Sequence, residues 1–364
     1  MSENKLSNGE PLVYAVILSG GKGERFWPKS RRDFPKQLLK ITDNRTMVET
    51  TVSRIEPLIP LNRIYLVASE EIKDSLLNVN IGIPHSNYLF EPFGRNTAPA
   101  IGLACFNLLK RDSNAIMVVL PADHYIKDNN SFLNYIKKAV EIAKMNFLVT
   151  FGIVPVRPET GYGYIESGEE ICDDVCKVKK FKEKPSQKKA NEFIKKGNFL
   201  WNSGIFVWGL KTIMEQFRRF QPLFTKSMER YNELESQTEQ KKMLNKIYNE
   251  TESISIDYAI MEKTSNVAVV RTSFDWDDVG SWSALERLTG KDKYRNIIIG
   301  DTVCIDTEDS IIVSEKGVIG TIGVSNFIIV HTDDATLVLP KEREQEVKEI
   351  VRRLSRNKKL KKYT

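Results

Sequence analysis

Short apolar runs alternate with segments of helical spacing over the first 150 residues of the chain. Runs rich in β-branched residues occupy 13–18, 63–68, 116–120 and 147–152, as is typical of buried strands. The stretches 48–55, 97–110 and 131–144 instead repeat apolar residues at intervals of three and four, which predicts amphipathic helices. Because strands and helices alternate, the pattern predicts an α/β fold in which helices cover both faces of a mostly parallel sheet.

The pattern changes in two later segments. Residues 211–248 are polar with an apolar stripe, and they predict two or three helices joined to the same domain. Between 296 and 339, short β-rich runs recur without intervening helices. This second pattern predicts a small β domain or a short solenoid whose turns stack on each other.

The end of the chain has helical spacing again. We predict one terminal helix over 341–360, whose apolar positions are Val347, Ile350, Val351 and Leu354. We accordingly expect a first domain over residues 1–289 and a second over 290–364, which holds the β-rich segment and the terminal helix.

Length and composition indicate a folded chain with a large hydrophobic core. Its 364 residues exceed the about 250–300 that one core usually supports. The 41% hydrophobic and 28% charged residues are far from the composition of a disordered chain. Seven cations near the C-terminus account for the net charge of +6, namely Arg352, Arg353, Arg356, Lys358, Lys359, Lys361 and Lys362. The rest of the chain is close to neutral, so we expect no nucleic-acid partner.

The cysteines and the apolar runs bear on the location of the protein. The four cysteines form no CxxC pair, which favours free thiols in a reducing compartment over a zinc site. The first apolar run, residues 12–18, is far shorter than the roughly 18 residues of a membrane span. We therefore expect a cytoplasmic protein without a membrane partner.

The candidate chemistry begins where the first predicted strand ends. Glycines in this turn allow backbone N–H groups to point towards an anion, and the turn consists of Ser19, Gly20, Gly21, Lys22 and Gly23. Arg25 and Lys36 add positive charge, and Pro28 and Pro35 stiffen the loop between them. The spacing fits neither the P-loop nor the dinucleotide fingerprint. A phosphate-binding loop is the favoured interpretation, and a tight turn with solvated cations is the alternative.

The whole string, GGKGERFWPKSRRDFPKQ, resembles the signature of the sugar nucleotidyltransferases, and its WPKSR and PKQ elements resemble those of the mannose-1-phosphate guanylyltransferases. The resemblance extends from about residue 12 to about residue 340. It implies a Rossmann-like, GT-A-like nucleotidyltransferase domain followed by a short left-handed β-helix and a terminal helix. The hydrophobic pattern alone does not set the hand of that β-helix.

The segment EPFGRNTAPA, residues 91–100, is a candidate for base recognition. One carboxylate such as Glu91 can accept hydrogen bonds from both N1–H and N2–H of guanine, a donor pair that adenine lacks. Taken alone, the segment also fits a Glu-Pro turn followed by an N-capped helix with Thr97 as the cap. Its similarity to the guanine-side segment of the guanylyltransferases implies nucleotide-binding roles for Glu91, Arg95, Asn96 and Thr97.

Two acidic segments are candidates for holding a metal ion. Asp123 follows the strand 116–120, and a hard oxygen ligand there suits Mg²⁺, which takes one or two carboxylates and completes its shell with phosphate and water. We interpret the neighbouring His124 as a solvated or structural imidazole and not as a ligand. The second ligand lies in FDWDDVGSW, where the resemblance implies Asp278 and leaves Asp277 as a neighbouring possibility.

Three further segments imply contacts with a sugar phosphate. They are GYGYI with Gly163, FKEKP with Glu183 and Lys184, and WNSGIF with Asn202. Each alone also fits a turn, a solvated charge or a strand residue. Their order after the glycine turn resembles that of the pyrophosphorylases, which implies that these four residues bind the sugar phosphate.

The resemblance implies a reaction in which GMP passes from GTP to mannose 1-phosphate, giving GDP-mannose and pyrophosphate. Mg²⁺ is the implied cofactor, with Asp123 also on the nucleotide side. The implied catalytic residues are Arg25, Lys36, Asp123, Lys184 and Asp278. The alternatives are another sugar 1-phosphate or nucleotide, or a catalytically silent protein that binds GDP-sugars. We also expect a homodimer.

Overall fold

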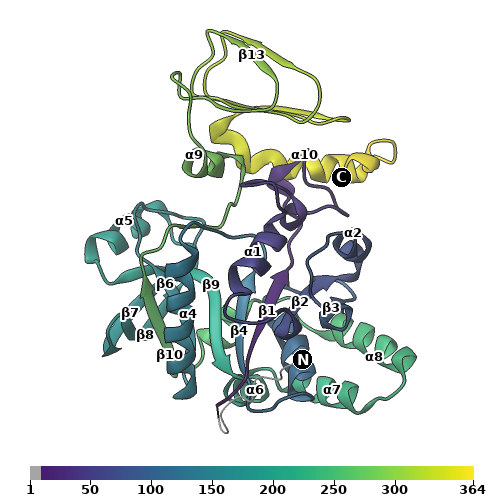
Figure 1. The fold of residues 1–364 in the computed structure, drawn as a ribbon, viewed down its shortest axis with the longest axis vertical. Helices are drawn as coiled ribbons and strands as arrows, with labels where there is room; N and C mark the ends of the chain where they lie inside the picture. The colour runs from purple at the N-terminus through teal and green to yellow at the C-terminus, as the bar shows by residue number, and fades with distance from the viewer. Residues whose placement is uncertain (1–9) are drawn as a thin grey trace.

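A nine-stranded sheet organises most of residues 10–364, the part of the chain that this computed structural model describes (Figure 1). The strand order is β3-β2-β1-β4-β9-β6-β10-β8-β7. Strands β9 and β8 run antiparallel to their neighbours, so the sheet is mixed. The strands are β1 (Val13–Ser19), β2 (Ile64–Ser69), β3 (Tyr88–Glu91), β4 (Ile116–Pro121), β6 (Leu148–Ile153), β7 (Tyr164–Cys172), β8 (Val175–Lys182), β9 (Phe199–Gly209) and β10 (Val267–Thr272).

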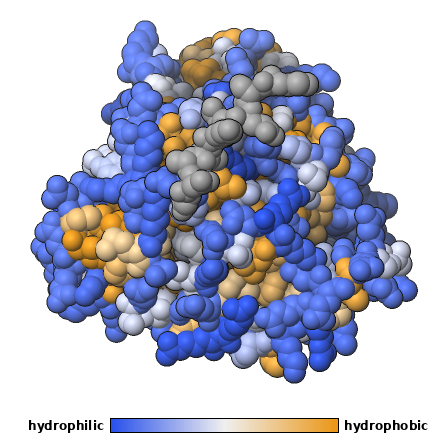
Figure 2. Space-filling model, turned by 60° about the horizontal axis from the view of Figure 1, so that its bottom comes forward, coloured by the Kyte–Doolittle hydropathy of each residue, from blue (hydrophilic) through white to orange (hydrophobic). Residues whose placement is uncertain are grey.

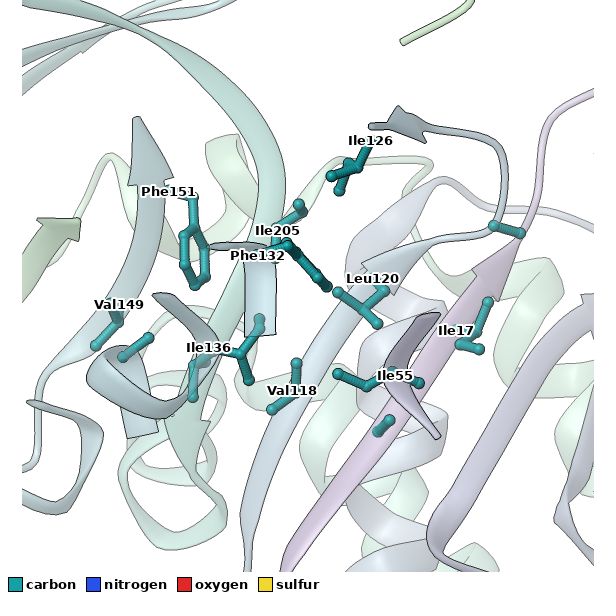
Figure 3. Close-up of a cluster of buried hydrophobic side chains, with 14 of the residues drawn as sticks. Ile17, Ile55, Val118, Leu120, Ile126, Phe132, Ile136, Val149, Phe151 and Ile205 are labelled. Carbon is teal, nitrogen blue, oxygen red and sulfur yellow. The ribbon is translucent and has the colours of Figure 1, made fainter. Parts of the chain in front are cut away.

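Helices cover both faces of the sheet, because alternate strand residues point to opposite sides. On one face, Ile17 of β1 belongs to the same core as Ile55 and Phe132 (Figure 3). The helices of this face are α1 (Met47–Ile55), α2 (Lys73–Leu77), α4 (Asn129–Lys144) and α5 (Gln187–Lys196). Val16 of β1 belongs to the opposite core, which is covered by α3 (Thr97–Leu109), α6 (Leu210–Phe220), α7 (Pro222–Glu233) and α8 (Gln237–Glu250). The segment predicted as two or three helices therefore contains three.

The order of the strands determines where a ligand can bind. From β1 the chain continues to β2 on one side, whereas β4 pairs with the other edge of β1. Ligands of open α/β sheets bind at such a switch point, at the carboxyl ends of the strands. The turn after β1 and the segment after β4 meet at this edge, where a short ribbon of β5 (Tyr125–Ile126) and β11 (Trp276–Asp277) also lies.

The C-terminal strands stack as the predicted solenoid. Strands β12, β14 and β16 pair in parallel, as do β13 and β15, and β17 pairs antiparallel with β16. Figure 1 shows these coils above α9 (Leu285–Leu288) and α10 (Val347–Arg356). The strands are β12 (Ile297–Ile299), β13 (Thr302–Ile305), β14 (Ile311–Ser314), β15 (Ile319–Ile322), β16 (Phe327–His331) and β17 (Thr336–Pro340).

The prediction of one terminal helix over 341–360 was too long at both ends. Residues Lys341–Glu346 form a 3-10 turn, and α-helical geometry holds only over α10. Asn357 has an extended backbone, and its side chain accepts a hydrogen bond from the N–H of Lys359, which ends the helix.

The β-helix packs directly on the first domain. A single apolar cluster joins Phe26 and Trp282 to Ile311, Ile328 and Val347. Helix α10 contacts the turn that holds Phe26, and the indole Nε1 of Trp27 donates to the carbonyl of Tyr363 at 2.7 Å. Because the two parts share a core, packing does not mark a boundary at residues 289 and 290, and that boundary stays a prediction. The homodimer also stays a prediction.

Hydrophilic side chains predominate on the face shown in Figure 2, where apolar side chains form small separate patches. Among the helices of residues 10–364, none combines the length and the hydrophobicity needed to span a bilayer.

Two glycines of the β-helix allow a matched test of its packing. Gly300 (φ +85°) and Gly317 (φ +70°) are both left-handed, but a Cβ at Gly300 would lie 2.0 Å from the carbonyl oxygen of Ser314, whereas at Gly317 it would meet open space. We expect Gly317→Ala to cost about 1–2 kcal/mol, the usual penalty of a left-handed backbone. Gly300→Ala adds a backbone clash and should lower the melting temperature further. Equal melting temperatures in thermal unfolding would contradict this packing.

Candidate active site

A cleft of about 700 Å³ lies at the carboxyl edge of the sheet, at the switch point beside β1. It brings together residues that are distant in the chain, and most of the predicted site residues line it. Those are Ser19, Gly20, Gly21, Lys22, Glu91, Asn96, Thr97, Asp123, Gly163, Glu183, Lys184, Asn202 and Asp278. Gly23, Arg25, Lys36 and Arg95 do not line the cleft.

Gly23 has a different role from the glycines that precede it. Gly20 and Gly21 have open space beside them, so their backbone is accessible from the cleft. Gly23 has φ +59°, and a Cβ there would lie 2.4 Å from Cβ of Lys36. Glycine at this position therefore lets the turn of Lys36 pack against the loop.

Lys36 is buried and bridges the two predicted metal segments. Its Nζ donates to Oδ2 of Asp123 at 2.8 Å and to the carbonyl oxygen of Asp278 at 2.6 Å. Burial alone would raise the pKa of the Asp123 carboxyl, but the Lys36 ammonium outweighs it, so the pKa lies below its usual value. Asp123 is therefore ionised at neutral pH.

Of the two adjacent aspartates, Asp278 faces the cleft. Its Oδ1 accepts from the hydroxyl of Tyr162 at 2.9 Å, and burial raises the pKa of its carboxyl. Asp277 is buried away from the cleft, where its carboxylate binds the Arg287 guanidinium and accepts from the N–H of Val279 at 2.8 Å. Since its oxygens are already engaged, Asp277 is the weaker candidate for a metal ligand.

Arg25 lies beside this acidic turn. Its Nη1 donates to the carbonyl of Gly280 at 3.3 Å, while its buried Nε has no partner within residues 10–364. Burial and the nearby charges of Arg25 and Lys184 lower the pKa of Lys348 on α10. The terminal helix thus places a further cation near the two predicted phosphate-binding cations, which the sequence did not indicate.

Glu91 lines the cleft at the end that is predicted to bind the nucleotide. Its side chain is 5% exposed, its Oε1 has no partner in the described part of the chain, and burial raises its pKa to about 7. The cap of α3 is Asn96 rather than Thr97, since its side chain accepts from the N–H of Thr97 at 2.8 Å. The Thr97 hydroxyl instead accepts from the N–H of Ile256, and Arg95 donates to the carbonyl of Tyr248.

The opposite end of the cleft holds the predicted sugar contacts. A Cβ at Gly163 would lie 2.6 Å from Oε2 of Glu183, so glycine leaves the room that this carboxylate occupies. Lys184 is exposed and lies 3.1 Å from Oε1 of Glu183. The amide of Asn202 donates to Oδ1 of Asp257 at 2.8 Å.

Sequence reasoning missed several residues of the cleft. Gln37 is buried, donates to the carbonyl of Ser19 at 3.2 Å and leaves its Oε1 unpartnered among residues 10–364. Gln37 and Tyr162 lie within the motifs PKQ and GYGYI, so the sequence contained a signal for both residues. Asp257 gave no such signal, because it lies in the mostly apolar segment ISIDYAIM, which contains no motif.

His124 also lines the cleft, and its environment fits the structural role that we predicted. Its Nδ1 accepts from the indole Nε1 of Trp276 at 3.2 Å. Burial lowers the pKa of the imidazole to about 4, so the ring is neutral.

Comparison with known proteins agrees with this architecture. Residues 14–294 match the nucleotidyl transferase family, and residues 300–354 match the MannoseP isomerase/GMP-like beta-helix domain. A mannose-1-phosphate guanylyltransferase of Escherichia coli is 39% identical over 94% of this chain and 76% of its own length. RfbM of Salmonella typhimurium, which has the same description, is 39% identical over 94% of this chain and 72% of its own.

A solved structure is similar over nearly the whole chain. The crystal structure of a Thermus thermophilus protein, described as mannose-1-phosphate geranyltransferase, has a TM-score of 0.86 and 37% identity. The match covers 94% of this chain and 99% of that one. The chain therefore belongs to the nucleotidyl transferase family. Within that family it is a member of the mannose-1-phosphate guanylyltransferases with a β-helix domain, which confirms the predicted resemblance.

The burial of Glu91 predicts a pH-dependent stability. Its pKa rises from 4.5 to about 7 on folding, so the folded state binds the extra proton and stability falls as the pH rises between these values. This shift corresponds to about 3 kcal/mol. We expect Glu91→Gln, which carries no charge, to gain up to about that much relative to the wild type between pH 5 and pH 8. Chemical denaturation at both pH values measures the difference, and a gap that is independent of pH would contradict the assignment.

Proposed function

We propose that this protein transfers GMP from GTP to mannose 1-phosphate and releases GDP-mannose and pyrophosphate. The observation that carries the proposal is the arrangement of one continuous cleft. A glycine loop and Glu91 lie at one end, Glu183 and Asn202 lie at the other, and Asp123 and Asp278 lie within the same cleft. Membership of the guanylyltransferases supports the choice of substrates.

The carboxylates of the cleft suit Mg²⁺. Asp123 and Asp278 would hold the ion, since Mg²⁺ takes one or two protein carboxylates and completes its shell with phosphate oxygens and water. When bound, Mg²⁺ would neutralise charge on the phosphates.

The protein has to position two anions rather than supply a nucleophile. A phosphate oxygen of mannose 1-phosphate attacks the α-phosphorus of GTP, and the bond from that phosphorus to the β-phosphate oxygen breaks as pyrophosphate leaves. The backbone of Gly20 and Gly21 would bind the triphosphate, and the exposed Lys184 would bind the sugar phosphate. Alignment of the reacting atoms and charge stabilisation are then the main contributions to the rate.

Lys36 and Arg25 would provide the fixed positive charge of the site. Lys36 is held by Asp123 and by the backbone of Asp278, so its ammonium is oriented before substrate binds. Arg25 does not line the cleft, so it would act on a phosphate through its charge and not through a direct hydrogen bond. Groups fixed in this way need little reorganisation during the reaction.

At the nucleotide end, Glu91 would distinguish guanine from adenine. Its free Oε1 can accept from the base edge, and two N–H donors from guanine favour the ionised carboxylate. Adenine lacks that donor pair, so it would leave a buried charge unpaired, which is costly.

We also propose a cytoplasmic location and a homodimer. The four cysteines are free, as in a reducing compartment. Exposed apolar side chains of the β-helix offer a surface for a second copy, and they include Val303, Ile305, Val318 and Ile322.

A substrate panel tests the reaction. Pyrophosphate release is measured for GTP, ATP, UTP and dTTP with mannose, glucose and galactose 1-phosphates, each with and without Mg²⁺. We expect GTP with mannose 1-phosphate and Mg²⁺ to give the highest rate. No release from that pair would refute the proposed reaction, whereas a faster rate with another sugar would change the substrate. Binding of GDP-mannose without turnover would indicate the catalytically silent alternative.

Substitution of the cleft carboxylates tests their role. We expect Asp123→Asn and Asp278→Asn each to lower kcat by about 100-fold or more, as loss of a charge-stabilising group does in other enzymes. Asp275→Asn is the matched control, because Asp275 lies in the same acidic segment but is exposed and outside the cleft. A fully active Asp278→Asn variant with an impaired Asp277→Asn variant would reverse the choice between the two neighbours.

A further inference from the structure

The sugar end of the cleft contains a second carboxylate besides Glu183. Asp257 lines the cleft and begins a π-helical turn, Asp257–Met261. Such turns are rare in proteins and are often found at functional sites. The reaction proposed above gives Asp257 no role, so its presence in the cleft requires a separate explanation.

Asp257 forms its strongest described contact with Asn202. The Nδ2 of Asn202 donates to Oδ1 of Asp257 at 2.8 Å. On the other side of the amide, Oδ1 of Asn202 accepts from the backbone N–H of Gly204 at 3.3 Å, with the Thr150 hydroxyl at the same distance. A carboxylate can only accept when ionised, and a backbone N–H can only donate. These two neighbours therefore fix which end of the amide carries the nitrogen.

The backbone around Asn202 is irregular as well. The pairing of β6 with β9 shifts register between Thr150 and Gly152, opposite Asn202, and Gly204 has φ +69°. Irregularities of this kind re-aim side chains at the edge of a site. The shifted strand and the π-helical turn thus bring an amide and a carboxylate together at the sugar end.

We propose that Asp257 is a positioning residue for the sugar phosphate, because it holds the Asn202 amide with its second N–H free to donate to a sugar hydroxyl. That N–H has no other partner within residues 10–364. The inference rests on the proposed function, in which Asn202 contacts the sugar.

The charge state of Asp257 supports this arrangement. Burial raises the pKa of its carboxyl to about 6, the hydrogen bond from Asn202 opposes that rise, and the nearby Glu183 and Glu262 carboxylates add to it. The carboxylate is thus partly desolvated and depends on the amide for compensation. The pair is mutually stabilising, so removal of one partner changes the other.

Asp257→Asn tests the proposal, since it removes the charge and retains the size of the side chain. We expect KM for mannose 1-phosphate to rise by about tenfold or more, the usual effect of losing a hydrogen bond to a charged group. KM for GTP should change by less than about twofold. Glu252→Gln is the matched control, because it removes an exposed carboxylate close to the same turn but outside the cleft, and it should leave both KM values unchanged.

A double substitution separates positioning from a general structural effect. If Asp257 acts through Asn202, Asn202→Ala with Asp257→Asn should raise KM for the sugar phosphate no further than Asn202→Ala alone. Thermal unfolding confirms that each variant is folded. An unchanged sugar KM in Asp257→Asn, an equal rise in both KM values, or additive effects in the double variant would overturn the inference.

The wild-type protein separates this inference from the proposed function. Turnover by the wild type together with any of the overturning results leaves the proposed function intact and removes the role of Asp257. Calorimetric titration of mannose 1-phosphate into both proteins gives a second measurement, and weaker binding by Asp257→Asn supports the inference. If the wild type neither turns over nor binds the sugar phosphate, both proposals fail.

Discussion

The ammonium of Lys36 joins three parts of the chain that are far apart in sequence. Lys36 lies on the turn after the glycine loop. Its ammonium binds Asp123, which follows β4 in the chain, and the backbone of Asp278, which follows β11. A buried cation is costly without partners, so the position of each segment depends on the others. Gly23 is part of the same constraint, because a side chain there would collide with Lys36. The charge centre of the cleft is therefore set by packing as well as by electrostatics.

The two ends of the cleft are built differently around this centre. The nucleotide end relies on parallel strands β1 and β3 and on the capped start of α3, where Glu91 and Thr97 lie. The sugar end relies on the antiparallel strand β9 and on a π-helical turn, whose backbones are irregular. In the proposed function, the parallel part of the sheet would thus hold the base, and the antiparallel part would shape the pocket of the sugar phosphate. This division fits a family in which related proteins share a fold and differ in substrates.

The sequence predicted the helices and strands and most of the residues that line the cleft. It predicted fewer of the side-chain contacts that hold those residues in place. Strands such as 116–120 have a local apolar pattern, and short motifs mark residues such as Asp123. The choice between Asp277 and Asp278 depends on Arg287, which has no motif that links it to them. The early end of α10 depends on a local contact of Asn357 that the apolar spacing does not reveal. Asp257 reaches the cleft, and Lys348 the vicinity of Arg25 and Lys184, through tertiary packing. Long-range contacts of this kind leave no periodic signal in a single sequence.

The indole of Trp27 is hydrogen-bonded to the carbonyl of Tyr363, a partner 336 positions later in the chain. The ribosome makes Trp27 early, and at about 5–20 residues per second it needs roughly 20–70 s more to reach that partner. Through this interval the loop that contains Trp27 lacks its hydrogen bond to Tyr363 and its packing against α10. The order of synthesis therefore delays this contact of the loop until the β-helix and α10 have been made.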